Sequence, residues 1–135
     1  MSIEFARKMS LAYNLSCKSL CQELKLPQTA FDILMFLANN PNYKTASDIV
    51  EIRKIKANLV SVNVDRLVQE GYLHRRKTEL LCTPKAQPVI EKGRGLQQDF
   101  MERLLFNMDD NKKNELKEII HIMEQNLDTI LKGDK

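Results

Sequence analysis

Residues 53–77 hold most of the side chains in this sequence that could do chemistry. The segment has seven basic side chains against two acidic ones, a local charge of +5; the rest therefore sums to −2, because the whole chain carries +3. Short side chains lie among the basic ones: Ala57, Asn58, Ser61 and Val62. An amide can pair with adenine, a hydroxyl can donate or accept, and a small apolar group can contact a thymine methyl. A basic stretch in a slightly acidic chain is typical of a nucleic-acid surface, and the alternative is a solvated charged face.

Whether these groups share one surface depends on the backbone of residues 54–70, where two periods compete. Apolar and polar residues alternate over 59–65, which is rich in β-branched side chains and so favours a strand. Val60, Val64 and Leu67 instead fall on one face of an amphipathic helix. The helix is the better interpretation because a strand here would have only the following hairpin to pair with. Tertiary context commonly overrides valine's helix penalty of roughly 0.5 kcal/mol.

The remaining segments predict further helices and one hairpin. The expected elements are helices over 2–24, 29–41 (ending in a turn at 39–42), 45–52 and 54–70, strands over 72–75 and 79–82, a helix over 84–107, and a last helix from Asp109 or Asp110 to 131. Thr45 and Asp48 fit a capping box. Pro88, Gly93 and Gly95 should weaken or kink the first half of the 84–107 helix.

This order predicts a mainly α protein with a small β-hairpin wing, a winged helix-turn-helix. In that arrangement the second helix of the pair lies in the major groove of DNA. The amides at the start of the 54–70 helix and the side chain of Lys56 suit phosphate. The hairpin adds the basic run His74-Arg75-Arg76-Lys77.

Three stretches resemble the multiple antibiotic resistance regulator (MarR) family. They are TASDIV at 45–50, VSVNVDRLVQEGYL at 60–73 and CTPKA at 82–86, framed by long helices. The most specific part is the run from Asp65 to Leu73, which leads into a hairpin and a Thr-capped helix. The resemblance covers essentially the whole chain.

The resemblance implies one domain over residues 1–135. About 28–83 would form the DNA-binding part, and 1–26 and 84–135 the dimerisation helices. It implies a cytoplasmic homodimer on a palindromic operator of double-stranded DNA, repressing transcription until released by a small phenolic or anionic ligand or by cysteine oxidation. The expected DNA-binding residues are Thr45, Lys56, Ala57, Asn58, Ser61, Val62, Arg66, His74, Arg75, Arg76 and Lys77. The apolar stripes on 2–24 and 110–131 independently indicate an interface.

The hairpin departs from the family pattern. Gly71 to Thr83 spans twelve positions, roughly seven fewer than in relatives, although hairpin loops can be as short as two residues. Either the wing is truncated or a mobile tip is missing from this chain. The short wing and modest basic count also motivate a second hypothesis, a helical protein-interaction or anti-regulator module that keeps the fold without binding DNA.

Two of the three cysteines, Cys17 and Cys21, are one helical turn apart, about 6 Å along the axis. Tyr13 lies one turn earlier, and some members of the family sense peroxides with a cysteine near tyrosines. The alternative is that both thiols are small buried fillers at the dimer interface, the commoner role. An odd number of cysteines without a disulfide framework predicts a reducing cytoplasm.

Catalysis, metals and membranes find little support in the sequence. It has no Gly-rich phosphate loop, no G-x-S-x-G and no His-carboxylate motif, so neither an enzyme nor a cofactor is expected. Asp109-Asp110 is more simply a helix cap than a catalytic pair. His74 and His121 show no metal-ligand spacing to the cysteines. No apolar run is long enough to span a bilayer, and the N-terminus does not resemble a secretory leader.

Overall fold

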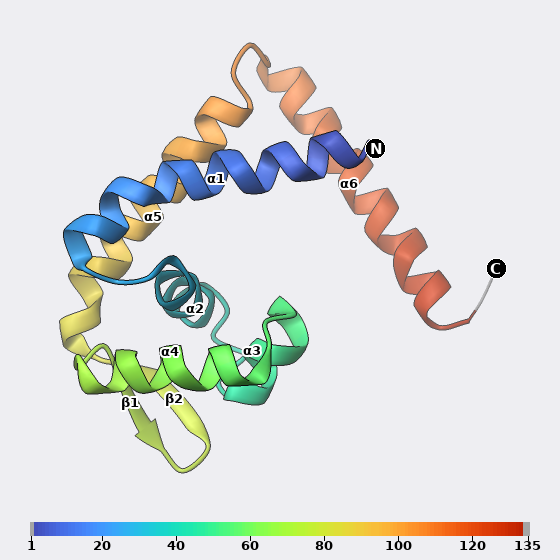
Figure 1. The fold of residues 1–135 in the computed structure, drawn as a ribbon. Coiled ribbons are helices and arrows are strands. Elements are labelled where there is room, and N and C mark those ends of the chain that lie inside the picture. The colour runs from blue at the N-terminus through green and yellow to red at the C-terminus, as the bar shows by residue number, and fades with distance from the viewer. Residues whose placement is uncertain (1, 134–135) are drawn as a thin grey trace. The chain divides into compact units, whose positions relative to one another are not determined.

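The structure, a computed structural model, describes residues 2–133 and divides into two compact units, Met1–Phe100 and Met101–Lys135. The ends of the expected 1–135 domain, residues 1, 134 and 135, lie outside the described residues. The elements are α1 (Ile3–Leu24), α2 (Gln28–Asn39), α3 (Ala46–Arg53), α4 (Ala57–Gln69), β1 (Leu73–Arg76), β2 (Glu79–Cys82), the 3-10 helix η1 (Pro84–Ala86), α5 (Gln87–Leu104) and α6 (Asp110–Leu131) (Figure 1). The predicted mainly helical fold with one antiparallel hairpin is confirmed.

The segment with two competing periods is helical. Val60, Val64 and Leu67 are buried, as the 3.6-residue period requires. The helix begins three residues later than the expected position, Lys54. That lysine caps α3 in the left-handed conformation (φ 55°) and so forms the turn between α3 and α4.

The core of the first unit is built around α2, which lies between α1 and α4 (Figure 1). Its side chains face both neighbours because the helix is apolar almost all round. Ile33, Leu34 and Leu37 belong to the cluster that also takes in the apolar face of α4. Phe31 and Met35 pack instead against α1, beside its buried cysteines. This double burial makes α2 the element that connects the long first helix to α4.

Helix α5 runs without interruption from Gln87 to Leu104, and its proline and glycines do not divide it. Pro88 lies in the first turn, where proline's missing N–H has no partner in any case. Gly93 is buried, and a Cβ built on it would lie 2.4 Å from the Met35 sulfur. A Cβ built on Gly95 would meet no atom within 4 Å. Gly93 therefore allows α5 to approach the Met35 side chain of α2 closely.

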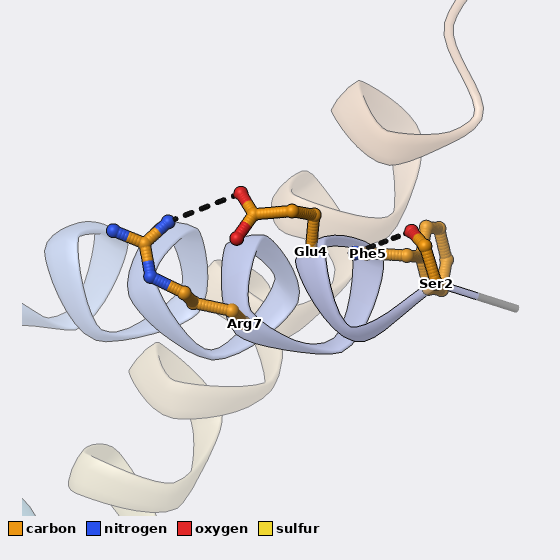
Figure 2. A network of polar contacts seen from close by, with 4 residues as sticks. All are labelled: Ser2, Glu4, Phe5 and Arg7. Carbon is orange, nitrogen blue, oxygen red and sulfur yellow. Dashed lines mark hydrogen bonds and ion pairs between the residues drawn. The ribbon is translucent and has the colours of Figure 1, made fainter.

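The two ends of α1 are capped in different ways. At its start the hydroxyl of Ser2 accepts a hydrogen bond from the amide of Phe5 (3.2 Å), and Arg7 pairs with Glu4 at 3.4 Å (Figure 2). At its end Lys25 adopts the left-handed conformation (φ 55°), and its amide bonds back to the last turn. That conformation directs the chain into Leu26, which is buried in the core.

The expected capping box at the start of α3 is confirmed. The hydroxyl of Thr45 accepts from the amide of Asp48 (3.1 Å), and the Asp48 carboxylate accepts from the amides of Lys44 (3.0 Å) and Thr45 (3.1 Å). These two backbone hydrogen bonds hold the pKa of the Asp48 carboxyl below its ordinary value of 3.8. The box thus ties the loop before α3 to its first turn.

Replacing Thr45 with Ala should lower the free energy of unfolding by about 1 kcal/mol, because a helix-start amide loses its acceptor.

The Asp48 carboxylate should also make the stability of the protein depend on pH. Its folded pKa is depressed, so its contribution is present above the ordinary pKa and is lost as the pH falls through the folded value. Urea titrations at neutral and acidic pH check this. Asp48→Asn should reduce the difference between the free energies of unfolding at neutral and at acidic pH. If that difference is unchanged, the role given to the Asp48 carboxylate is wrong.

The second unit consists of the end of α5, a short turn and α6. Asp109 caps α6, its carboxylate accepting from the amide of Lys112 (2.8 Å). None of the residues of α6, all of which are described, is buried. Its exposed apolar side chains are Ile119, Ile120, Ile122, Met123, Leu127, Ile130 and Leu131. Most of them follow the stripe expected from the sequence.

Candidate nucleic-acid interface

The solvent-facing side of α4 carries short side chains with free hydrogen-bonding groups. Ala57, Asn58, Ser61 and Val62 are all exposed, with Val62 65% exposed. Within the described chain, the side chains of Asn58 and Ser61 make no hydrogen bond to another residue. An unengaged amide and hydroxyl on a convex helix can pair with the donors and acceptors of base edges.

The start of α4 is also open to an anion. Lys56 occupies the N-cap position and makes no capping hydrogen bond with its side chain. The first amides of the helix therefore keep free N–H groups, which, with the helix dipole, favour a phosphate oxygen. The exposed ammonium of Lys56 adds a positive charge at the same end.

The opposite side of α4 and its C-terminal end are occupied by contacts within the protein. Asn63, which the sequence did not single out, is 7% exposed, and its amide donates to the Leu59 carbonyl (2.8 Å). At the end of the helix Lys85 donates to the carbonyl of Glu70 and lies 5.0 Å from the Tyr72 ring centroid. Thr83 occupies the N-cap position of η1 ahead of Pro84, as the sequence predicted, but its hydroxyl donates to the Gly71 carbonyl and makes no capping hydrogen bond. The sequence had no signal for the Thr83 and Lys85 contacts because they join residues 12 and 15 positions apart.

The hairpin beside α4 is short and closed. Arg76 pairs with Glu79 in the register, which leaves a two-residue loop, Lys77-Thr78. Lys77 has φ 57°, a positive value of the kind found in two-residue hairpin turns. The Leu80 amide donates to the carbonyl of Lys44 (2.7 Å), which joins the hairpin to the loop before α3. The shorter wing is thus a complete hairpin.

Two arginines of the hairpin have acidic partners. Arg75 forms a short ion pair with Asp65 on the exposed side of α4, and Arg76 lies 3.7 Å from Glu79 across the hairpin. The carboxylates that pair with these two arginines come from α4 and β2. The Asp65 pair links the hairpin to α4, while the exposed His74 and Lys77 side chains have no ion pair among the described residues.

Among the expected binding residues, Arg66 and Thr45 use their side chains to bond to the protein's own backbone. The Arg66 guanidinium donates from Nη2 to the Lys25 carbonyl (2.9 Å), and its Nε lies 3.5 Å from Glu70. The Thr45 hydroxyl is part of the capping box. The other expected residues lie on two neighbouring exposed surfaces. Lys56, Ala57, Asn58, Ser61 and Val62 are on α4 or its cap, and His74, Arg75, Arg76 and Lys77 are on the hairpin or its loop.

The cysteines expected as redox sensors lie in an apolar site. Cys17 and Cys21 are buried beside Phe31 and Met35. Burial raises the pKa of Cys17 above its ordinary value and that of Cys21 to about 11. Burial also raises the pKa of Tyr13, to about 12; its hydroxyl accepts a hydrogen bond from Gln97 (3.0 Å). Because the thiolate is the reactive form, this environment disfavours rapid oxidation of either thiol.

Iodoacetamide at mildly alkaline pH should therefore modify Cys17 and Cys21 slowly in the folded protein. Cys82, only partly buried in β2, should react first even though burial raises its pKa as well. Peptide mass spectrometry over time gives the order. In denaturant all three should react at similar rates, which serves as the control. Modification of Cys17 in the folded protein as fast as in denaturant would contradict this assignment and support redox sensing.

Two further searches concern the described residues only. Residues 2–133 contain no group of three or more His, Cys, Asp or Glu side chains placed to hold a metal ion. No helix among them has both the length and the apolar character needed to cross a membrane.

Comparisons with known proteins agree with this geometry. The sequence model of the MarR family matches residues 24–80. A MarR family transcriptional regulator from Listeria monocytogenes, solved in complex with a 26mer DNA, is 18% identical with a TM-score of 0.77 and covers 100% of this chain and 97% of its own. A MarR transcriptional regulator from Methanosarcina mazei is 19% identical with a TM-score of 0.74, covering 96% and 94%.

A transcriptional regulator from Thermotoga maritima is 23% identical with a TM-score of 0.65, and the match covers 91% of this chain and 94% of that one. No curated protein matches the sequence. The solved structures establish the fold of the whole chain, and the family model covers α2 to the start of β2, the part of the chain that carries the surfaces described above. Residues 24–80 therefore match the MarR family model, in a chain that has the winged-helix fold of MarR family regulators.

Proposed function

We propose that this protein is a transcriptional regulator that binds double-stranded DNA through α4 and its hairpin. The observation that carries the proposal is the unengaged pair Asn58 and Ser61 on the exposed side of α4, at the end where the helix amides are free. The Listeria structure with a 26mer DNA supports it by fold. With α4 in the major groove, Asn58, Ser61 and Val62 contact base edges. Lys56, Arg76 and Lys77 contact the phosphate backbone.

We further propose that the protein acts as a homodimer and represses a palindromic operator. Helix α6 supports the dimer, because none of its residues is buried and a stripe of its apolar side chains is exposed. On α1 the side chains of Ile3, Phe5, Leu11 and Leu15 are exposed as well. Two-fold symmetry would place the two α4 helices about 34 Å apart on half-sites one helical turn apart.

Release by a small molecule is part of the proposal and has a candidate cavity in the first unit. The cavity has a volume of about 250 Å³ and lies between α1, α2, the end of α3 and α5. Tyr13, Asp32, Arg53 and Gln97 line it with polar groups. Burial raises the pKa of the Asp32 carboxyl, and the charge of Arg53 opposes the shift. A ligand with both donors and acceptors fits this lining.

Fluorescence anisotropy against the DNA upstream of the protein's own gene, at low and moderate salt, tests the function. Replacing Arg76 and Lys77 with Ala should weaken binding to every sequence and reduce the slope of log K against log salt by about 1 to 2. The control variant carries Lys112→Ala and Lys117→Ala, which remove the same charge from the second unit. Its salt slope should equal that of the wild type. Asn58→Ala should alter which operator is preferred, and equal losses on all sequences would exclude it as a base reader.

One observation favours a second candidate, a protein-interaction or anti-regulator module without DNA binding. The wing is short, and both of its arginines are already paired with carboxylates. Failure to bind any upstream DNA even at low salt, with a folded dimer, would select this alternative.

A further inference from the structure

The tip of the hairpin presents the hydroxyl of Thr78. Lys77 and Thr78 form the two-residue loop between β1 and β2, and both side chains are exposed. Of the other four threonines in the sequence, Thr29 is partly buried, and three bond their hydroxyls to backbone groups: Thr45, Thr83 and Thr129. Thr78 is thus the one threonine of the described chain that is exposed and makes no side-chain hydrogen bond.

Three basic residues lead directly into this hydroxyl. In the stretch Arg75-Arg76-Lys77-Thr78 the two arginines precede the hydroxyl by three and two positions. One class of protein kinases selects substrates with arginines at these positions, because carboxylates beside its active site pair with the guanidinium groups. The hairpin tip therefore has the sequence of an acceptor for such a kinase.

A second stretch has the same spacing in a different backbone. Arg7 and Lys8 precede Ser10 by three and two positions, and Ser10 is also exposed. Ser10 lies within α1, however, where the backbone is hydrogen-bonded along the helix. A kinase binds its substrate as an extended segment and would have to unwind part of α1 to reach this serine. Because the two acceptors share a sequence pattern, the local fold decides between them.

The hairpin can extend its tip at a much lower cost. Strand β1, which carries both arginines, is already extended and has β2 as its one strand partner in the described chain. Strand β2 is the anchored one, because the Leu80 amide donates to the Lys44 carbonyl. Across the tip, Arg76 and Glu79 lie 3.7 Å apart, and an exposed pair of this kind is worth at most about 1 kcal/mol. Opening this last pair lengthens the loop and leaves the buried side chains of the hairpin in place.

A phosphate on Thr78 would neutralise the tip. Three basic side chains against Glu79 give residues 75–79 a formal charge of +2, and a phosphothreonine adds about −1.5 to −2 at neutral pH. Its oxygens accept charge-assisted hydrogen bonds from neighbouring guanidinium and ammonium groups. The nearest cations along the chain, Arg76 and Lys77, are those that the proposed function assigns to the DNA backbone.

We propose that Thr78 is a phosphorylation site for an arginine-directed protein kinase and that the phosphate prevents DNA binding. The γ-phosphoryl group of a nucleoside triphosphate passes to Thr78 Oγ1. A new P–O bond replaces the bond between the β- and γ-phosphates, the nucleoside diphosphate leaves, and the hydroxyl proton goes to a base of the kinase. The phosphate then pairs with Arg76 and Lys77 of its own chain. This second step rests on the proposed DNA-binding function, whereas the acceptor site does not.

The site is tested by incubating the folded full chain with ATP and the catalytic subunit of cyclic-AMP-dependent protein kinase, which selects arginines at these positions. We expect one phosphate per chain, located at Thr78 by peptide mass spectrometry and absent from Thr78→Val. Ser10 should be modified at least about tenfold more slowly, because its helix must open first. No phosphate at Thr78, or modification of Ser10 at an equal rate in the folded chain, would overturn the site.

The effect on DNA binding needs a separate measurement, fluorescence anisotropy with the DNA upstream of the gene. The phosphorylated protein should bind about hundredfold more weakly at low salt, and the slope of log K against log salt should fall by about 2, because two cations are withdrawn. Thr78→Val taken through the same kinase reaction should bind as the wild type does. A phosphorylated protein with unchanged affinity would overturn the switch and keep the site. If the unmodified protein binds no DNA, the proposed function fails while the phosphorylation result still stands.

Discussion

Replacing Gly93 with Leu should lower the free energy of unfolding by about 3 kcal/mol, the upper part of the range for overpacking a filled core. A Cβ at this position would lie 2.4 Å from the Met35 sulfur, 2.8 Å from its methyl carbon and 3.2 Å from a Phe31 ring carbon. Met35 is itself only 2% exposed, so its side chain has little free space to move into. The substitution would push α5 away from α2 or force Met35 out of its rotamer.

Gly95 offers a matched control two residues away on the same helix. A Cβ there meets nothing within 4 Å. Gly95→Leu should therefore stabilise the protein by about 1 kcal/mol, the gain in helix propensity over glycine. Urea unfolding followed by circular dichroism measures both changes. Equal effects of the two substitutions would show that backbone freedom, and not the contact with α2, decides the role of Gly93.

Replacing Ser61 with Glu should weaken DNA binding by roughly hundredfold or more. A carboxylate on this side of α4 would face the phosphates and the acceptor-rich groove, and like-charge contacts at an interface cost several kcal/mol. Ser61 is exposed and its side chain makes no hydrogen bond in the described chain, so the fold should be unaffected. Anisotropy titrations with the operator measure the affinity, and circular dichroism verifies that the helices remain.

The same change at Ser19, which is exposed on α1, is the control and should leave DNA affinity nearly unchanged. If Ser61→Glu binds DNA as well as the wild type does, α4 does not read DNA through this side. The interaction-module alternative would then account better for the unengaged surface.

The sequence predicted the elements because their signals are local. Spacing alone identified the buried side of α4, and the Thr45 and Asp48 pair was recognised as a cap from two residue types three positions apart. The start of α4 was misplaced because Lys54 adopts a left-handed conformation that is usual for glycine or asparagine. Lysine is not a residue type from which such a turn can be predicted.

The side-chain ties around α4 could not be predicted in the same way. Asp65 and Arg75 are ten residues apart, and their pairing depends on the angle at which the hairpin leaves the helix. Arg66 bonds to a backbone carbonyl 41 residues away, and a carbonyl has no signature in the sequence. Gly93 was expected to weaken its helix, because propensity is visible in the sequence and the Met35 contact is not. The candidate base readers at Asn58 and Ser61 were identified from residue type, and their role stays a prediction.

Three lysines have a left-handed backbone conformation. Lys25, Lys54 and Lys77 all have φ between 55° and 57°, a conformation that costs a residue with a side chain about 1 kcal/mol. Glycine at any of these positions would relieve that strain but remove a cation from the first unit. Replacing these lysines with glycine should therefore raise the thermal stability of the protein. Each replacement would also weaken its electrostatic attraction to polyanions.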